Sequence, residues 1–99
     1  MSTPEEKKDR FRRQLRELGV YDDIKAICLR QGFTDVGALY GPERVKHIAQ
    51  ARHEAMYWLR EKFKWSYPVL GDFFDRDHTT AMAAVRKVEA SRTSSVNER

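Results

Sequence analysis

Apolar residues recur at helical spacing along most of this chain, and this periodicity is the strongest constraint on its fold. Phe11, Leu15 and Leu18 lie three or four residues apart, and similar spacing continues through residues 45–63. No run of alternating apolar and polar residues indicates a β-strand. The sequence therefore predicts an all-α protein, a small helical bundle with a single core.

Capping residues and chain breakers divide the pattern into helices. Thr3, Pro4 and Glu6 form a capping-box pattern, and Gly19 is typical of a helix end. Asp22 and Thr34 are the expected caps of the next two elements. The segment after residue 42 is expected as one helix ending near residue 64, or as two that meet near residue 51. Two more helices are expected, at 66–74 and 78–90, followed by a flexible polar tail at 91–99.

The charge balance favours an anionic partner. The net charge is +4 and the sequence pI is about 9.4. Such a balance fits nucleic acid, an anionic membrane surface or an acidic protein, and does not choose among them. The charged helix expected within residues 1–21 is open to two interpretations, a solvated helix along the core or a basic arm that holds phosphate. Its arginines are Arg10, Arg12, Arg13 and Arg16.

The compartment is expected to be the cytoplasm. Cys28 is the single cysteine, so no internal disulfide can form, and its apolar neighbours make it an expected core residue. The segment starting at Met1 has no signal-peptide pattern, and no segment approaches the roughly 20 apolar residues of a membrane span. We therefore expect no membrane contact.

The sequence offers no pattern for catalysis or metal binding. His47, His53 and His78 lack ligand spacing, and the pair His53-Glu54 is followed by Tyr57 where a zinc protease would have histidine. No nucleophile and base stand out as a pair. We expect no enzyme activity, no metal, no cofactor and no small-molecule substrate.

Two expected helices near the C-terminus have helix-turn-helix spacing. The segments 66–74 and 78–90 are joined by a turn of about three residues. At the start of the second lie groups that can hydrogen-bond base edges in a major groove: Arg76, Asp77, His78, Thr79 and Thr80. An ordinary capped helix with a polar first turn fits the same pattern equally well.

Four blocks in order resemble one bacterial family. They are Ala51-Arg52-His53-Glu54-Ala55-Met56-Tyr57-Trp58-Leu59-Arg60-Glu61, Ser66-Tyr67-Pro68 through Gly71-Asp72, Arg76-Asp77-His78-Thr79-Thr80, and Val85-Arg86-Lys87-Val88-Glu89. Together they are similar to the C-terminal DNA-binding domain of the chromosomal replication initiator DnaA, a Trp-repressor-like helix-turn-helix. The resemblance covers residues 22–90 and implies a double-stranded DNA partner.

The resemblance also implies roles for individual residues. Base contacts fall on Arg76, Asp77, His78, Thr79 and Thr80 in the major groove, and on Arg52 in the minor groove. Phosphate contacts fall on Arg60, with Lys62, Lys64 and Ser66 close enough to join it. The implied function is sequence-specific duplex binding that regulates replication initiation or transcription, with the protein associated with the nucleoid.

The chain departs from the family pattern at three places. Only Asp75 separates Phe74 from Arg76, where the family usually has two residues, and His53 replaces the usual glutamine. The loop 41–47 also carries fewer positive charges. No phosphate-binding glycine-rich loop of the family's ATPase module occurs in this sequence. The alternative function is a protein-interaction module that kept the fold but not DNA binding; against it, the block 76–80 is intact.

Overall fold

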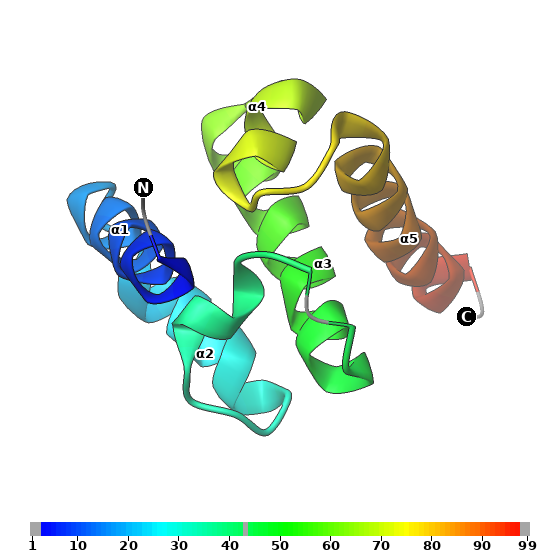
Figure 1. Ribbon diagram of the computed structural model, residues 1–99. Coiled ribbons are helices and arrows are strands. Elements are labelled where there is room, and N and C mark those ends of the chain that lie inside the picture. The colour runs from blue at the N-terminus through cyan, green and yellow to red at the C-terminus, as the bar shows by residue number, and fades with distance from the viewer. Residues whose placement is uncertain (1–2, 43, 98–99) are drawn as a thin grey trace.

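Helix α3 (Lys46–Phe63) forms the axis around which the other elements are arranged (Figure 1). The computed structural model describes residues 3–42 and 44–97, with side chains to Arg92, and these contain five α-helices and no strand. The other elements are α1 (Pro4–Glu17), α2 (Tyr21–Arg30), the 3-10 turn η1 (Val36–Leu39), α4 (Tyr67–Phe73) and α5 (His78–Asn97). The expected all-α bundle is confirmed. Met1, which starts the segment that lacks a signal-peptide pattern, lies outside the described residues.

Helices α1 and α2 lie on one side of α3, α5 lies on the other, and α4 covers one end (Figure 1). A single core fills the space between them. Its largest fully buried side chains are Phe11, Leu15, Val20, Ile24, Cys28, Val36, Leu39, Met56, Leu59, Leu70, Phe74 and Val85. Cys28 is a core residue as expected, and burial raises the pKa of its thiol to about 11.

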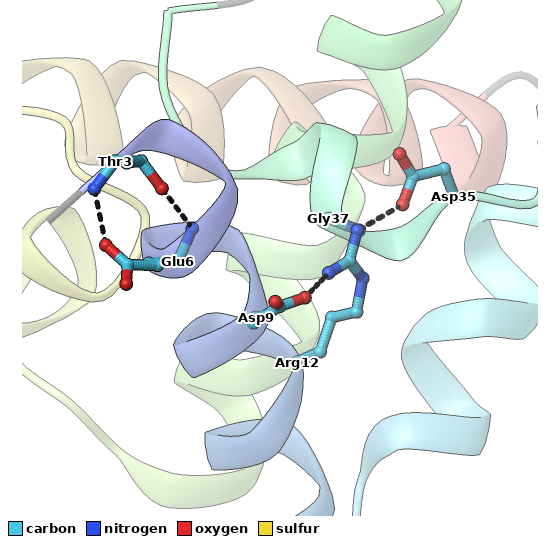
Figure 2. Close-up of polar contacts among 6 residues, drawn as sticks. All are labelled: Thr3, Glu6, Asp9, Arg12, Asp35 and Gly37. Carbon is cyan, nitrogen blue, oxygen red and sulfur yellow. Dashed lines mark hydrogen bonds and ion pairs between the residues drawn. The ribbon is translucent and has the colours of Figure 1, made fainter.

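The first helix starts with the predicted capping box. Thr3 N donates to Glu6 Oε1 at 2.7 Å, and Glu6 N donates to Thr3 Oγ1 at 3.1 Å (Figure 2). The apolar stripe of α1 then places Phe11 and Leu15 in the core. The helix ends before Gly19, whose φ of 76° suits a residue without a side chain.

Arginines on α1 hold this helix on the domain. Arg12 pairs with Asp9 on its own helix, and its Nη2 donates to Asp35 Oδ1 at 3.0 Å (Figure 2). Asp35 raises the pKa of the Arg12 guanidinium, which stays charged. Arg16 lies with its Cζ 4.3 Å from the centre of the Tyr21 ring. Both side chains therefore contact other parts of the domain at its surface.

Two predicted helix caps are wrong. Helix α2 begins at Tyr21 after the buried Val20, so Asp22 lies in the first turn and caps nothing. The cap of η1 is Asp35, whose Oδ1 accepts from Gly37 N at 3.0 Å, instead of Thr34. In both places the helix starts at a residue held by a tertiary contact. For α2 this contact is the burial of Val20, and for η1 it is the ion pair of Asp35 with Arg12.

The last helix is longer than predicted. We expected it to end near Ala90, but α5 continues to Asn97. No glycine or proline interrupts residues 91–97, and Arg92 lies with its Cζ 4.8 Å from the centre of the Tyr57 ring on α3. The flexible tail predicted from residue 91 is therefore helical up to 97, and residues 98–99 lie outside the described residues.

Candidate nucleic-acid interface

Helices α4 and α5 form the predicted helix-turn-helix, and α4 is capped as expected. Ser66 is exposed and its Oγ accepts from Val69 N at 3.4 Å, with Pro68 in the first turn, where a missing N–H is tolerated. Leu70 and Phe74, on the inner side of this segment, are buried in the core. The signals that predicted α4, Ser66 and Pro68, lie at the start of the helix itself, and the helix begins where they place it.

The turn between the helices is tight and bonded to α4. Asp75 adopts a φ of 59°, in the left-handed region that Asp tolerates better than most residues. Asp75 N donates to Asp72 O at 3.1 Å, and Arg76 N donates to Gly71 O at 2.8 Å. The left-handed Asp75 thus closes a turn that is one residue shorter than the family pattern.

Asp77 caps the helix that would enter a major groove. Its Oδ1 accepts from Thr80 N at 2.8 Å and from Thr79 Oγ1 at 2.5 Å. These hydrogen bonds, with that from Thr79 first, lower the pKa of Asp77 from 3.8 to about 2. Asp77 therefore holds the first turn of α5 in place as a carboxylate.

We expect acid to remove this cap. Because the folded-state pKa of Asp77 is lowered, the stability that the carboxylate contributes is present above about pH 4 and is lost as pH falls toward 2. Urea unfolding at pH 5 and pH 2.5 should show a larger loss of stability in the wild type than in Asp77→Ser, which keeps a capping oxygen that does not titrate. Equal losses would contradict the assignment.

The first turn of α5 carries exposed polar side chains, and the part of the helix that follows is packed in the core. His78 and Thr79 are exposed and Thr80 is half-buried, whereas Ala81 and Val85 on the same helix are buried. The buried residues fix α5 on α3 and α4. Side chains able to hydrogen-bond base edges therefore project from a rigid support.

A basic cluster lies where α3 passes into α4. Lys62 and Lys64 are exposed, and Lys64 ends α3 with a φ of 60°. Arg60 is half-buried, with its Cζ 4.0 Å from the centre of the Tyr67 ring, and it donates to Trp65 O. The structure thus brings together three predicted phosphate ligands with Ser66, the cap of α4.

Arg52 and Arg76, two predicted base contacts, are engaged with backbone carbonyl groups of the protein itself. Arg52 is only 3% exposed, and its Nε donates to Leu39 O at 2.8 Å in the interior. The minor-groove contact implied by the resemblance stays a prediction, and it would require Arg52 to leave this interior position. Arg76 is half-buried in the turn, where its Nη1 donates to Gly41 O at 3.1 Å.

Two glycines shape this region through contacts that the sequence did not reveal. A Cβ at Gly71 would lie 2.6 Å from Arg76 O, so the turn packs directly on the backbone of α4. Gly41 has a φ of 97° and its N donates to Phe74 O at 3.1 Å. The Gly41-Pro42 pair signals a chain break, but no local signal shows what the break contacts.

The described residues contain neither a membrane-spanning helix nor a metal-binding cluster. No helix among them is long and apolar enough to cross a membrane. No three His, Cys, Asp or Glu side chains of residues 3–42 and 44–97 are grouped to hold a metal ion. His53 is half-buried, and burial, followed by the charge of Lys87, lowers its pKa.

Comparison with known proteins agrees with this geometry. Residues 21–88 match the family described as the bacterial DnaA protein helix-turn-helix. Over 65 residues the chain is 45% identical to the chromosomal replication initiator protein DnaA of Mycobacteroides abscessus. The match covers 66% of this chain but only 13% of that relative. No solved structure matches. Because the family match spans most of the chain and includes α2 through the main part of α5, this protein belongs to the DnaA helix-turn-helix family of DNA-binding domains.

Proposed function

We propose that this chain binds specific sequences in double-stranded DNA, with α5 as the recognition helix. The observation that carries the proposal is the exposed pair His78 and Thr79 at the tip of a helix whose next residues are buried. Imidazole and hydroxyl groups donate and accept hydrogen bonds at base edges, and a threonine methyl packs on thymine. Asp77 supports them by fixing the first turn.

Backbone contacts supply the affinity in this proposal. Lys62 and Lys64 are exposed beside the N-terminus of α4, and both carry flexible ammonium groups that suit phosphate. Arg60 is anchored on Tyr67 and holds the junction together as well as adding charge. Ser66 is exposed at the same junction, where its hydroxyl can donate to a phosphate oxygen while it caps α4.

The biological role that we propose is regulation at the DNA sites of an initiator or at promoters. The relative from Mycobacteroides abscessus is named a replication initiator, and 45% identity over the matched segment supports related sites. Selection of bound duplexes from a random pool tests the function directly. Recovery of one sequence shared with the initiator supports a role in replication, and a different sequence supports a separate regulator. Recovery of no preferred sequence contradicts specific binding and favours the interaction-module alternative.

Base readout should depend on the tip of α5. His78→Ala and Thr79→Ala should each weaken binding to the selected duplex by roughly 1–3 kcal/mol, with little change for a scrambled duplex. The reason is that each substitution removes hydrogen bonds to base edges and leaves the phosphate contacts in place. Ala90→Ser, exposed farther along the same helix, is the control. Equal losses on both duplexes would remove these residues from base readout.

Phosphate contacts should appear in the salt dependence. Lys62→Ala and Lys64→Gly should each make the log–log salt slope shallower by about one unit, for any duplex. Glycine accepts the left-handed conformation of Lys64, so this change removes charge without straining the chain. Arg13→Ala removes an exposed charge on α1 as a control. An unchanged slope for both lysine variants would place the cluster away from the backbone, and a changed slope for Arg13→Ala would place α1 on DNA.

A further inference from the structure

Two hydrogen bonds at Gly41, here called the joint, connect the loop after η1 to the turn before the recognition helix. Gly41 N donates to Phe74 O at 3.1 Å, and Gly41 O accepts from Arg76 Nη1 at 3.1 Å. Residues from α4 and from the turn thus hold Gly41 by both its polar backbone atoms. Gly41 itself is buried, so these atoms have little access to water.

The loop is held from α3 as well. Arg52 donates from Nε to Leu39 O at 2.8 Å, two residues before Gly41. Two arginines from different parts of the chain therefore bind two carbonyl groups of one short segment. Planar guanidinium groups suit this task because their several N–H donors keep a fixed geometry.

Aromatic side chains cover the joint from the side of α1. The Phe11 ring centre lies 5.6 Å from that of Tyr40, the residue before Gly41, and 5.3 Å from that of Phe74. Phe11 thus contacts both segments that the joint connects. Packing behind the joint leaves the loop and the turn little room to move separately.

We infer that Arg76 is a positioning residue that fixes the start of the recognition helix to the loop at Gly41, and that it does not read a base. This inference rests on the proposed function. The resemblance implied a base contact, but the half-buried guanidinium is engaged with Gly41 O. Turning it toward DNA would leave that buried carbonyl without this donor.

The joint also explains why binding should be sensitive to a residue that does not touch a base. Arg76 lies directly before the first turn of α5, and its bond to Gly41 O ties this turn to the rest of the domain. A change at the joint should therefore displace the whole first turn that carries His78 and Thr79, so discrimination should fall at every base pair of the site.

Arg76→Lys and Arg76→Met test the inference in the free protein and on DNA. Both variants should speed amide exchange at Gly41 and shift the amide resonances of residues 78–80 without DNA. Affinity for the selected duplex should fall by roughly tenfold, within the range for residues that share one contact. Preference should weaken across the whole site, and Arg76→Lys should keep the non-specific affinity because it keeps the charge.

A double-mutant cycle separates positioning from base contact. If Arg76 acts by positioning the recognition helix, Arg76→Met should cost less specific affinity in a His78→Ala background than in the wild type, because the base contact that it positions is already missing. The inference would be overturned if the losses of affinity in the two single variants multiplied in the double variant. It would also be overturned if Arg76 variants lost preference at one base pair only. Unchanged exchange at Gly41 in the free Arg76 variants would also overturn it. A wild type that selects no duplex would instead contradict the proposed function, which is a separate and distinguishable result.

Discussion

Phe11→Ala should lower the free energy of unfolding by about 3–5 kcal/mol. Phe11 is 1% exposed, and its ring centre lies 5.2–5.6 Å from those of Tyr40, Phe73 and Phe74. Truncation removes the buried ring and leaves a cavity between α1, the loop and α4 that backbone elements cannot easily fill. Small domains have only about 5–15 kcal/mol of stability, so much of it would be lost.

Thermal and urea unfolding followed by circular dichroism measure this effect. The melting temperature should fall by more than about 10 °C for a domain of this size. Phe11→Leu retains most of the buried apolar surface and should cost much less, and the exposed Arg13→Ala on the same helix should change little. Equal stability of wild type and Phe11→Ala would mean that α1 does not dock on the domain.

This result would matter because α1 precedes the segment that matches the family, residues 21–88. Arg12 on Asp35 and Phe11 in the aromatic cluster attach α1 to the domain through one polar and one apolar contact. The sequence indicated an amphipathic charged helix and left open whether its arginines serve the core or a phosphate. Arg12 and Arg16 contact Asp35 and Tyr21 at the surface of the domain, which favours the first of these interpretations for these two arginines.

Local signals predicted most of the secondary structure. The capping box at Thr3, the cap at Ser66 and the stop at Gly19 all involve residues within a few positions of the helix ends that they define. The helix-turn-helix followed from the same kind of signal, and the family match confirms it. The end of α5 was misplaced because Ser91 and Arg92 are polar, and polarity without glycine or proline does not end a helix.

Tertiary contacts account for what the sequence could not reveal at the candidate site. Arg52 and Arg76 bind the carbonyl groups of Leu39 and Gly41, and such partners, 13 and 35 residues away, leave no local pattern. Arg52 was therefore assigned to DNA through the family resemblance, and Arg76 through the resemblance and its chemistry, without knowledge of these partners. The exposed positions His78 and Thr79 remain predicted base contacts, because their surroundings agree with that role and binding itself is the test.

Gly71→Ala should disrupt the helix-turn-helix, although alanine is the better helix former by about 1 kcal/mol. A Cβ at this position would lie 2.6 Å from Arg76 O and 2.9 Å from Asp77 O. Both are backbone atoms, and Gly71 O also accepts from Arg76 N, so the turn cannot move without loss of this bond. We expect a loss of roughly 1–3 kcal/mol in stability, as for an overpacked core, and a larger relative loss of specific DNA binding.

Gly37→Ala is the matched control. It adds the same methyl group at another buried glycine, where the nearest atoms belong to a side chain instead of the backbone. A Cβ at Gly37 would lie 2.5 Å from Arg12 Nη2, the mobile end of a long side chain that can swing away. That variant should lose little more than the exposed Arg12–Asp35 pair, commonly below about 1 kcal/mol, and keep its DNA specificity. Urea unfolding and binding to selected and scrambled duplexes measure both effects. If Gly71→Ala were as stable and as specific as Gly37→Ala, the turn could not pack on α4 as described. The position of His78, which depends on that turn, would then also be contradicted.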